Sequence, residues 1–222
     1  WDPCPGEAHL DALRRSIVIG RYGAYGDVGT LDESRRRFNA HISGATTLPP
    51  DIRGVAFNLV AQVADRNTYD ALWALEKEAT LHEEKVRILG ALTRAHDKAL
   101  LSDLLERSIS EDVRIQDTPL VIVQTANNTE GRDLSWDFVK KNWDELNRRY
   151  GQGGFAIMRI VGLAAGFSTL ERETEVREFF ETHDAPSATR TVQQVLESIR
   201  LNCRWRALNL ESVGSWLARR TK

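Results

Sequence analysis

Apolar residues recur at steps of three and four along almost the whole chain, and this helical period most strongly limits what the chain can fold into. The clearest example is "SWDFVKKNWDELNRRY", residues 135–150, where Trp136, Val139, Trp143, Leu146 and Tyr150 form one apolar stripe. The glycines of the "GQGGF" that follows predict the end of this helix. Because sustained apolar–polar alternation is missing, we predict an all-α fold of roughly a dozen helices.

Prolines and capping residues mark where further helices begin. Proline is accepted in a first helical turn, and Asp, Ser, Thr or Asn ahead of it caps free amides. The segments "QDTPLVIVQTA" and "DAPSATRTVQQVLESIRLNC" both have this form. Each therefore predicts a helix that starts at its proline.

A weak internal repeat indicates how the helices pack. Shifting the chain by 29 positions places apolar residues on apolar residues: Leu59, Val60, Val63, Leu72 and Leu75 on Ile88, Leu89, Leu92, Leu101 and Leu104. Each unit is a helix, a short polar turn ("ADRN" or "RAHD") and a second helix. Such units bury their apolar faces by stacking, so we predict an α-α superhelix, a HEAT-like solenoid of stacked helical hairpins, with residues 1–222 as a single helical domain.

Charge and cysteine content exclude several classes of function. The 30 basic and 32 acidic side chains nearly cancel and are interspersed, which argues against nucleic-acid binding and against a polybasic membrane anchor. No apolar run is long enough for a membrane span, and the N-terminal residues lack the pattern of a signal peptide. With only two distant cysteines, Cys4 and Cys203, we expect a reducing, cytoplasmic location. The absent initiator Met suggests part of a longer protein.

The segment "LHEEKVRILG", residues 81–90, begins like a zinc-protease signature. That signature, HExxH, needs a second His four positions after the first so that both imidazoles share one helix face. Here His82 and Glu83 are present, but Val86 occupies the position of the second His. Zinc aminopeptidases of this type have a Glu as third ligand 23 positions after the first His, and that position is Leu105. A catalytic zinc site needs three protein ligands, so we expect no metal and no cofactor in this chain.

Other catalytic patterns are also missing. There is no Gly-x-Ser-x-Gly elbow, and Cys203 lies in register with apolar helix positions, which predicts a buried thiol. The Gly-rich "GRYGAYGDVG" lacks the Gly-Lys-Ser/Thr of a phosphate-binding loop and is interpreted as an inter-helix turn. Trp73, Trp136 and Trp143 have the spacing of core residues.

Three long segments carry a family resemblance: "WDPCPGEAHLDALRRSIV", "GRDLSWDFVKKNWDELNRRYGQGGF" and "FFETHDAPSATRTVQQVLESIRLNCRW". Together they resemble the C-terminal helical domain of gluzincin-type zinc aminopeptidases related to puromycin-sensitive aminopeptidase and aminopeptidase N. The resemblance covers essentially the whole chain. Its most specific positions are Gly131, Trp136, Phe138, Asn142, Trp143, Tyr150, Phe179, Phe180, Gln193, Glu197, Asn202 and Trp205.

The resemblance implies a role without bond chemistry. In that family a preceding catalytic domain carries HExxH, the third Glu and a Gly-x-Met-x-Asn loop, none of which occurs here, so zinc is expected in that other domain. The late C-terminal domain is then expected to form a concave cover over the cleft, with a peptide substrate and the catalytic domain of the same polypeptide as partners. Closure of such a cover would gate substrate entry.

Two candidate substrate-binding residues follow from the resemblance. The segment "LTRAHDKALLSDLLERS" is similar to a family segment in which an Arg holds the carboxylate end of long peptides, and the matching residue is Arg94, with Lys98 as a weaker companion. A guanidinium bonds carboxylate oxygens in pairs. The alternative is an ordinary exposed cation at a helix C-terminus.

A different class of function also fits the helical repeat: an autonomous HEAT-like protein-interaction module with a separate protein partner. The upstream reading frame separates the two hypotheses, because only the aminopeptidase hypothesis requires HExxH there. If the chain is cut from a larger enzyme, we also expect exposed surface near residues 1–13 and self-association through it.

Overall fold

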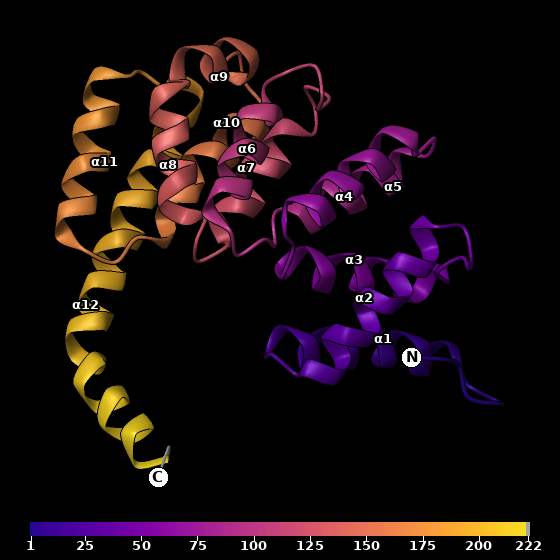
Figure 1. The fold of residues 1–222 in the computed structure, drawn as a ribbon. Helices are drawn as coiled ribbons and strands as arrows, with labels where there is room; N and C mark the ends of the chain where they lie inside the picture. Colours follow the sequence, from indigo (N-terminus) through magenta and orange to yellow (C-terminus); the bar gives the residue numbers. More distant parts are fainter. Residues whose placement is uncertain (221–222) are drawn as a thin grey trace. The chain divides into compact units, whose positions relative to one another are not determined.

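The computed structural model describes residues 1–220, which form twelve α-helices and two short 3-10 helices with no strand (Figure 1). The predicted all-α class is therefore confirmed. The elements are α1 (His9–Ala24), α2 (Val28–Ile42), α3 (Pro50–Gln62), α4 (Arg66–Glu78), α5 (His82–Leu92), α6 (Lys98–Ser108), α7 (Thr118–Asn127), α8 (Arg132–Lys141), α9 (Trp143–Tyr150), α10 (Phe155–Gly162), η1 (Leu163–Gly166), α11 (Leu170–Thr182), η2 (Pro186–Ala188) and α12 (Thr189–Arg220).

The helices form two compact units, one from Trp1 to Leu134 and one from Ser135 onward. In the first unit α1, α3, α5 and α7 contact one another in that order and form one layer. Helices α2, α4 and α6 pack against this layer from a second one. This is the order of contacts that stacked helical hairpins produce.

The positions of the 29-residue repeat lie at the centre of this first unit. Leu72, Leu101 and Leu104 are completely inaccessible to solvent, and almost all of the remaining repeat positions are buried or half-buried. Val63 is the exception, at 40% exposed. Its counterpart Leu92 is the last residue of α5, whereas α3 ends one residue earlier, at Gln62, so Val63 falls outside the packed helix.

Glycines allow α1 and α3 to approach closely. A Cβ atom added at Gly23 would lie only 2.5 Å from a methyl carbon of Leu59, and one at Gly20 would lie 3.0 Å from Val55. The prediction that "GRYGAYGDVG" is a turn is wrong in its first half. Residues 20–24 form the last turn of α1, and only residues 25–27 connect α1 to α2.

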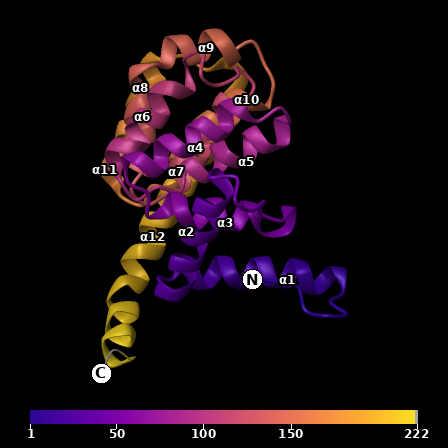
Figure 2. The ribbon, with the colours of Figure 1, turned by 45° about the vertical axis from the view of Figure 1, so that its right-hand side comes forward.

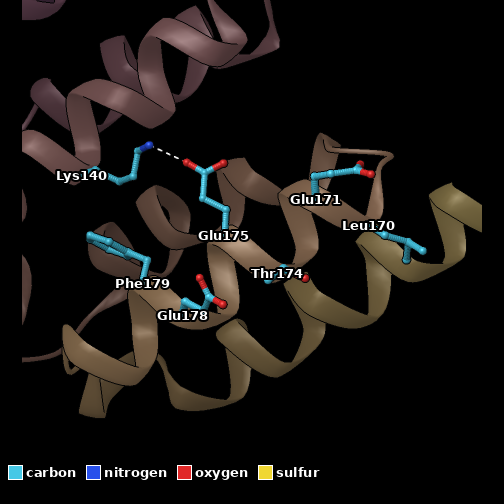
Figure 3. Close-up of a pocket in the computed structure, with 7 residues that line it drawn as sticks. All are labelled: Lys140, Leu170, Glu171, Thr174, Glu175, Glu178 and Phe179. Carbon is cyan, nitrogen blue, oxygen red and sulfur yellow. Dashed lines mark hydrogen bonds and ion pairs between the residues drawn. The ribbon is translucent and has the colours of Figure 1, made fainter.

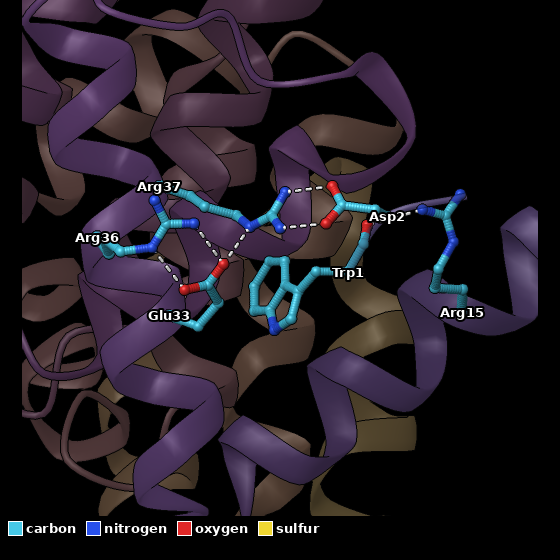
Figure 4. Close-up of polar contacts among 6 residues, drawn as sticks. All are labelled: Trp1, Asp2, Arg15, Glu33, Arg36 and Arg37. Carbon is cyan, nitrogen blue, oxygen red and sulfur yellow. Dashed lines mark hydrogen bonds and ion pairs between the residues drawn. The ribbon is translucent and has the colours of Figure 1, made fainter. Parts of the chain in front are cut away.

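Ion pairs attach the N-terminal segment to α1 and α2 (Figure 4). Arg37 donates two hydrogen bonds to the Asp2 carboxylate, at 2.8 and 2.9 Å, and a third to Glu33 at 2.6 Å. Its guanidinium also covers the ring of Trp1, and Arg15 donates to the Trp1 carbonyl oxygen. Trp1 is consequently half-buried against the core, while Leu10 and Leu13 remain exposed.

The second unit is organised around aromatic side chains. Trp136 and Trp143 pack against both Phe179 and Phe180 of α11, with ring centroids 5.3 to 6.1 Å apart. The predicted core positions of all three tryptophans are confirmed, since Trp73, Trp136 and Trp143 are at most 3% exposed.

The predicted helix over 135–150 is interrupted at one residue. Asn142 has φ −110° and ψ 19°, which separates α8 from α9. Its backbone amide and its side-chain amide both donate to the Phe138 carbonyl oxygen, at 3.0 and 2.9 Å, and this competition distorts the turn. The apolar stripe nevertheless continues, because Trp136, Val139 and Leu146 are all completely buried.

The predicted proline starts are confirmed in one case and shifted in the other. Pro119 lies in the first turn of α7, whereas Pro186 lies in η2, and α12 begins only at Thr189. The first half of α12 packs against α10, η1 and α11. Its second half projects from the other helices of its unit in both views (Figure 1 and Figure 2).

The projecting part of α12 explains why the prediction for Cys203 is wrong. Asn202 is the last residue of α12 that fastens it to η1, through bonds of 2.9 and 3.0 Å to the carbonyl oxygens of Ala165 and Phe167. Cys203 directly follows it and is half-buried, not buried. Beyond it Trp205 and Leu208 are 62% and 71% exposed.

Candidate functional site

One surface depression lies in the first unit, on the layer formed by α1, α3, α5 and α7. It consists of two adjoining parts, of about 400 and 470 Å³, which share Ala24, Gln62 and Arg94. We call the two parts together the inner groove. Its other polar lining residues are Ser16, Arg21, Asn58, Thr93, His96, Gln124, Asn127, Asn128 and Thr129.

The turn that carries Arg94 is rigidly held. The side-chain amide of Asn128, at the end of α7, donates to the carbonyl oxygens of Thr93 and Ala95 at 2.9 and 2.7 Å. On the other side, the His96 amide donates to the Gln62 carbonyl oxygen at 3.2 Å. The residues on both sides of Arg94 are thus fixed to α3 and α7, which positions its side chain over the groove.

Arg94 itself is exposed, and its guanidinium has no hydrogen-bond or ion-pair partner within residues 1–220. Lys98, the predicted companion, is in a different situation. Its ammonium nitrogen lies 3.3 Å from a Glu130 carboxylate oxygen, and Lys98 does not line the groove. Arg94 therefore lines the groove with an unpaired guanidinium, whereas Lys98 lies outside the groove lining and pairs with Glu130.

The groove also contains functional candidates that sequence reasoning missed. Arg21, in the last turn of α1, is exposed and has no side-chain partner among the described residues. The side-chain amides of Asn58, Gln62 and Asn127 are similarly free of partners in that part of the chain. The available signal was the pair of amide residues on each of α3 and α7, namely Asn58 with Gln62 and Gln124 with Asn127, but helical periodicity does not identify the face that carries the groove.

The electrostatics of the groove follow from its lining. No Asp or Glu is among the residues that line either part, although acidic residues outnumber basic ones in the whole chain. The Arg87 side chain lies against the lining residue Gly54, and both Arg87 and Arg53 pair with Glu84. Although burial acts to raise the pKa of Glu84, these two guanidinium groups hold it below its usual value. The groove can therefore attract anions.

The residues around His82 do not fit a zinc ion. Within residues 1–220 no three His, Cys, Asp or Glu side chains converge in a way that could hold a metal. The His82 ring instead contacts Arg114 at 3.1 Å and lies 3.6 Å from an Asp117 oxygen, while Leu105 is buried in the core. The positive Arg114 guanidinium next to the His82 imidazole would repel a cation.

A second depression lies in the other unit, over α11 (Figure 3). Its central carboxylate, Glu175, accepts hydrogen bonds from Trp136 at 3.0 Å, Lys140 at 2.5 Å and Arg172 at 2.6 Å. Although burial acts to raise the pKa of Glu175, these donors hold it below its usual value. Of the charged groups that line this depression, Lys140 and Glu175 pair with each other, which leaves no unpaired cation among its described lining residues.

Comparison with known proteins identifies the family. The family model described as the ERAP1-like C-terminal domain matches residues 1–201. The chain belongs to this family. The match spans both compact units and ends where the exposed part of α12 begins. The resemblance to aminopeptidase C-terminal domains is thus confirmed.

Individual relatives agree with this assignment. The chain is 35% identical to Aminopeptidase M1 of Arabidopsis thaliana over 210 residues, which cover 92% of this chain and 24% of the relative. It is 33% identical to Aminopeptidase M1-B of Oryza sativa subsp. japonica, with 97% and 24% covered. The Thyrotropin-releasing hormone-degrading ectoenzyme of Rattus norvegicus is 30% identical, with 80% and 17% covered.

The chain therefore spans about a quarter of the length of the plant aminopeptidases that it matches. Among the described helices, none has the length and apolar character needed to cross a membrane.

Proposed function

We propose that this chain is the non-catalytic C-terminal domain of a zinc aminopeptidase, which covers the catalytic cleft and helps to enclose and select peptide substrates. The observation that carries the proposal is the inner groove, with the unpaired guanidinium of Arg94 held above it. The family assignment supports the connection to aminopeptidases.

In this proposal the domain acts by binding and by excluding water. Arg94 bonds the terminal carboxylate of a long peptide. Because the turn that carries Arg94 is already fixed, it loses little conformational entropy when the peptide binds. Lys98 can bind the peptide carboxylate together with Arg94 only when its ion pair with Glu130 is broken. In this proposal zinc belongs to a preceding catalytic domain of the same polypeptide, and residues 1–220 here contribute no group of three metal-ligating side chains.

Two measurements test the catalytic part of the proposal. The purified chain should not hydrolyse an aminoacyl chromogenic substrate when zinc is in excess, and turnover by the chain itself would contradict the proposal. The natural reading frame upstream should encode HExxH and the third Glu. If it does not, the protein-interaction module becomes the better hypothesis.

The selection part is tested in the full-length enzyme. Arg94→Gln should raise KM about fivefold for long peptides with a free C-terminal carboxylate, since an exposed ion pair contributes up to about 1 kcal/mol. The matched control is Arg35→Gln, which removes an exposed arginine of α2 away from the groove. An equal effect of Arg94→Gln on C-terminally amidated peptides would exclude carboxylate binding.

We also propose a cytoplasmic location. It is supported by the two cysteines, Cys4 and Cys203, which are both free thiols, as is usual in reducing compartments. Cell fractionation tests this, and recovery from the extracellular fraction would contradict it.

A further inference from the structure

The inner groove contains a second arginine, and this suggests which peptides it prefers. Arg21 projects from α1, whereas Arg94 follows α5, and both line the same part of the groove. Neither guanidinium has a partner within the described residues, so each is available to a ligand. By contrast, Arg14, Arg15, Arg36 and Arg37, also on α1 and α2, are paired with carboxylates.

The groove also differs from the rest of the surface in its balance of charge. Its lining includes Arg21, Arg94 and His96 but no carboxylate, in a chain whose formal net charge is −2. Next to it, the two arginines Arg53 and Arg87 share the single carboxylate of Glu84 and leave one further positive charge. A ligand with more than one negative charge is therefore favoured over a neutral one.

The uncharged lining points to a peptide as the anion. Asn58, Gln62 and Asn127 have free side-chain amides, and each amide offers both a donor and an acceptor. Peptide groups need that pair, whereas phosphates need donors only. The lining contains no Phe, Tyr or Trp on which a nucleic-acid base could stack.

We propose that the inner groove is specific for acidic peptides, with Arg21 as a second carboxylate-binding residue that receives an Asp or Glu side chain of the ligand. The proposal rests on the proposed function, because it assigns a substrate preference to the same groove. The free amides bond the main chain of the peptide, and Arg94 and Arg21 bond carboxylates at two separate points.

The experiment measures binding to the purified chain of residues 1–222 by fluorescence anisotropy. The ligands are N-terminally blocked, fluorescein-labelled peptides of equal length that carry either Glu or Gln near a free C-terminus. We expect the Glu peptides to bind about fivefold more tightly than the Gln peptides. This preference should decrease as salt is raised, because the sites are exposed.

Variants assign the preference to Arg21. Arg21→Gln should weaken the binding of Glu peptides about fivefold and that of Gln peptides much less, so that most of the difference between them is lost, and Arg35→Gln should change neither affinity. If Arg21 had only a structural role, Arg21→Gln would weaken the binding of both peptides equally, and this result would overturn the proposal. Circular dichroism of each variant confirms that it remains folded.

The remaining outcomes also decide the question. Equal binding of Glu and Gln peptides would overturn the acidic preference, while the enclosing role of the domain would stand. Tighter binding of a single-stranded oligonucleotide than of the Glu peptide would overturn the assignment to peptides. In contrast, if Arg94→Gln left the KM of the full-length enzyme for long peptides unchanged, this would count against the proposed function and not against the role of Arg21.

Discussion

Single side chains decide how accurately Arg94 is positioned. Asn128 alone fastens both neighbours of Arg94, through two hydrogen bonds to main-chain carbonyl oxygens. Its own oxygen accepts from the Glu130 amide at 3.0 Å, so the side chain is satisfied at three points. The same arrangement recurs in the second unit, where Asn202 donates to the carbonyl oxygens of Ala165 and Phe167.

We therefore predict that Asn128→Ala lowers the free energy of unfolding by about 1 to 3 kcal/mol, because two half-buried carbonyl oxygens lose their donor. It should also weaken peptide binding, since the Arg94 turn becomes mobile. Urea denaturation gives the first quantity and anisotropy the second. For the free energy of unfolding the control is Asn127→Ala, at an exposed neighbour without a side-chain partner in the described chain, where we expect a change below about 0.5 kcal/mol.

Among the elements, α12 is divided into two parts with different environments. Val195 and Ile199 are buried against the rest of the second unit, and the buried Glu173 accepts hydrogen bonds from Arg200 at 2.6 and 3.0 Å. Leu208 and Leu210, farther along the helix, lack such packing within their own unit, since they are 71% and 61% exposed. Helical propensity alone gives a chain only marginal stability in water.

This division predicts a gradient of amide hydrogen exchange along α12. Amides of residues 208–220 should be protected at least about tenfold less than those near Ile199, because only the packed part must unfold with the core. Hydrogen exchange followed by mass spectrometry measures this, with peptides of α11 as the internal reference. Uniform protection along the helix would contradict this prediction, because it would show that the exposed half is covered in solution.

At the scale of the whole molecule, stability should depend on acidic pH, because carboxylates in both units are paired with arginines. Hydrogen bonds from Arg36 and Arg37 lower the pKa of Glu33 to about 2, and those from Arg148 and Arg149 lower the pKa of Glu145 to about 2. Similar pairing lowers the pKa of the buried Glu173.

Since these groups have ordinary pKa values near 4.5 in the unfolded chain, the unfolded state binds more protons at low pH. Their stabilisation is complete above pH 4.5 and is lost as pH falls toward 2. We expect Tm to decrease steadily over this interval. Glu33→Gln should make the decrease smaller, whereas Glu111→Gln, at an exposed position without an ion pair in the described chain, should not. A Tm that is independent of pH between 4.5 and 2 would contradict this.

The sequence by itself determined the helical class, the core and the family. Apolar spacing is a local property, so the stripe of Trp136, Val139 and Leu146 predicted buried residues correctly. The spaced aromatic and amide residues were specific enough to indicate aminopeptidase C-terminal domains, which the family model confirmed. The same local reasoning was wrong at two residues. At Asn142 a side-chain hydrogen bond interrupts the predicted helix, and at Cys203 the surface against which α12 packs comes to an end.

Only the tertiary structure decided what the inner groove contains. Arg21 and Arg94 lie on different helices, and only the stacking of α1, α3 and α5 brings them into one depression. It also separated Arg94 from Lys98, a turn later in sequence, because an ion pair with Glu130 holds Lys98 away from the groove. Periodicity determines which residues of a helix face the core, but a solenoid has two exposed faces. Which of them is concave depends on how successive helices pack.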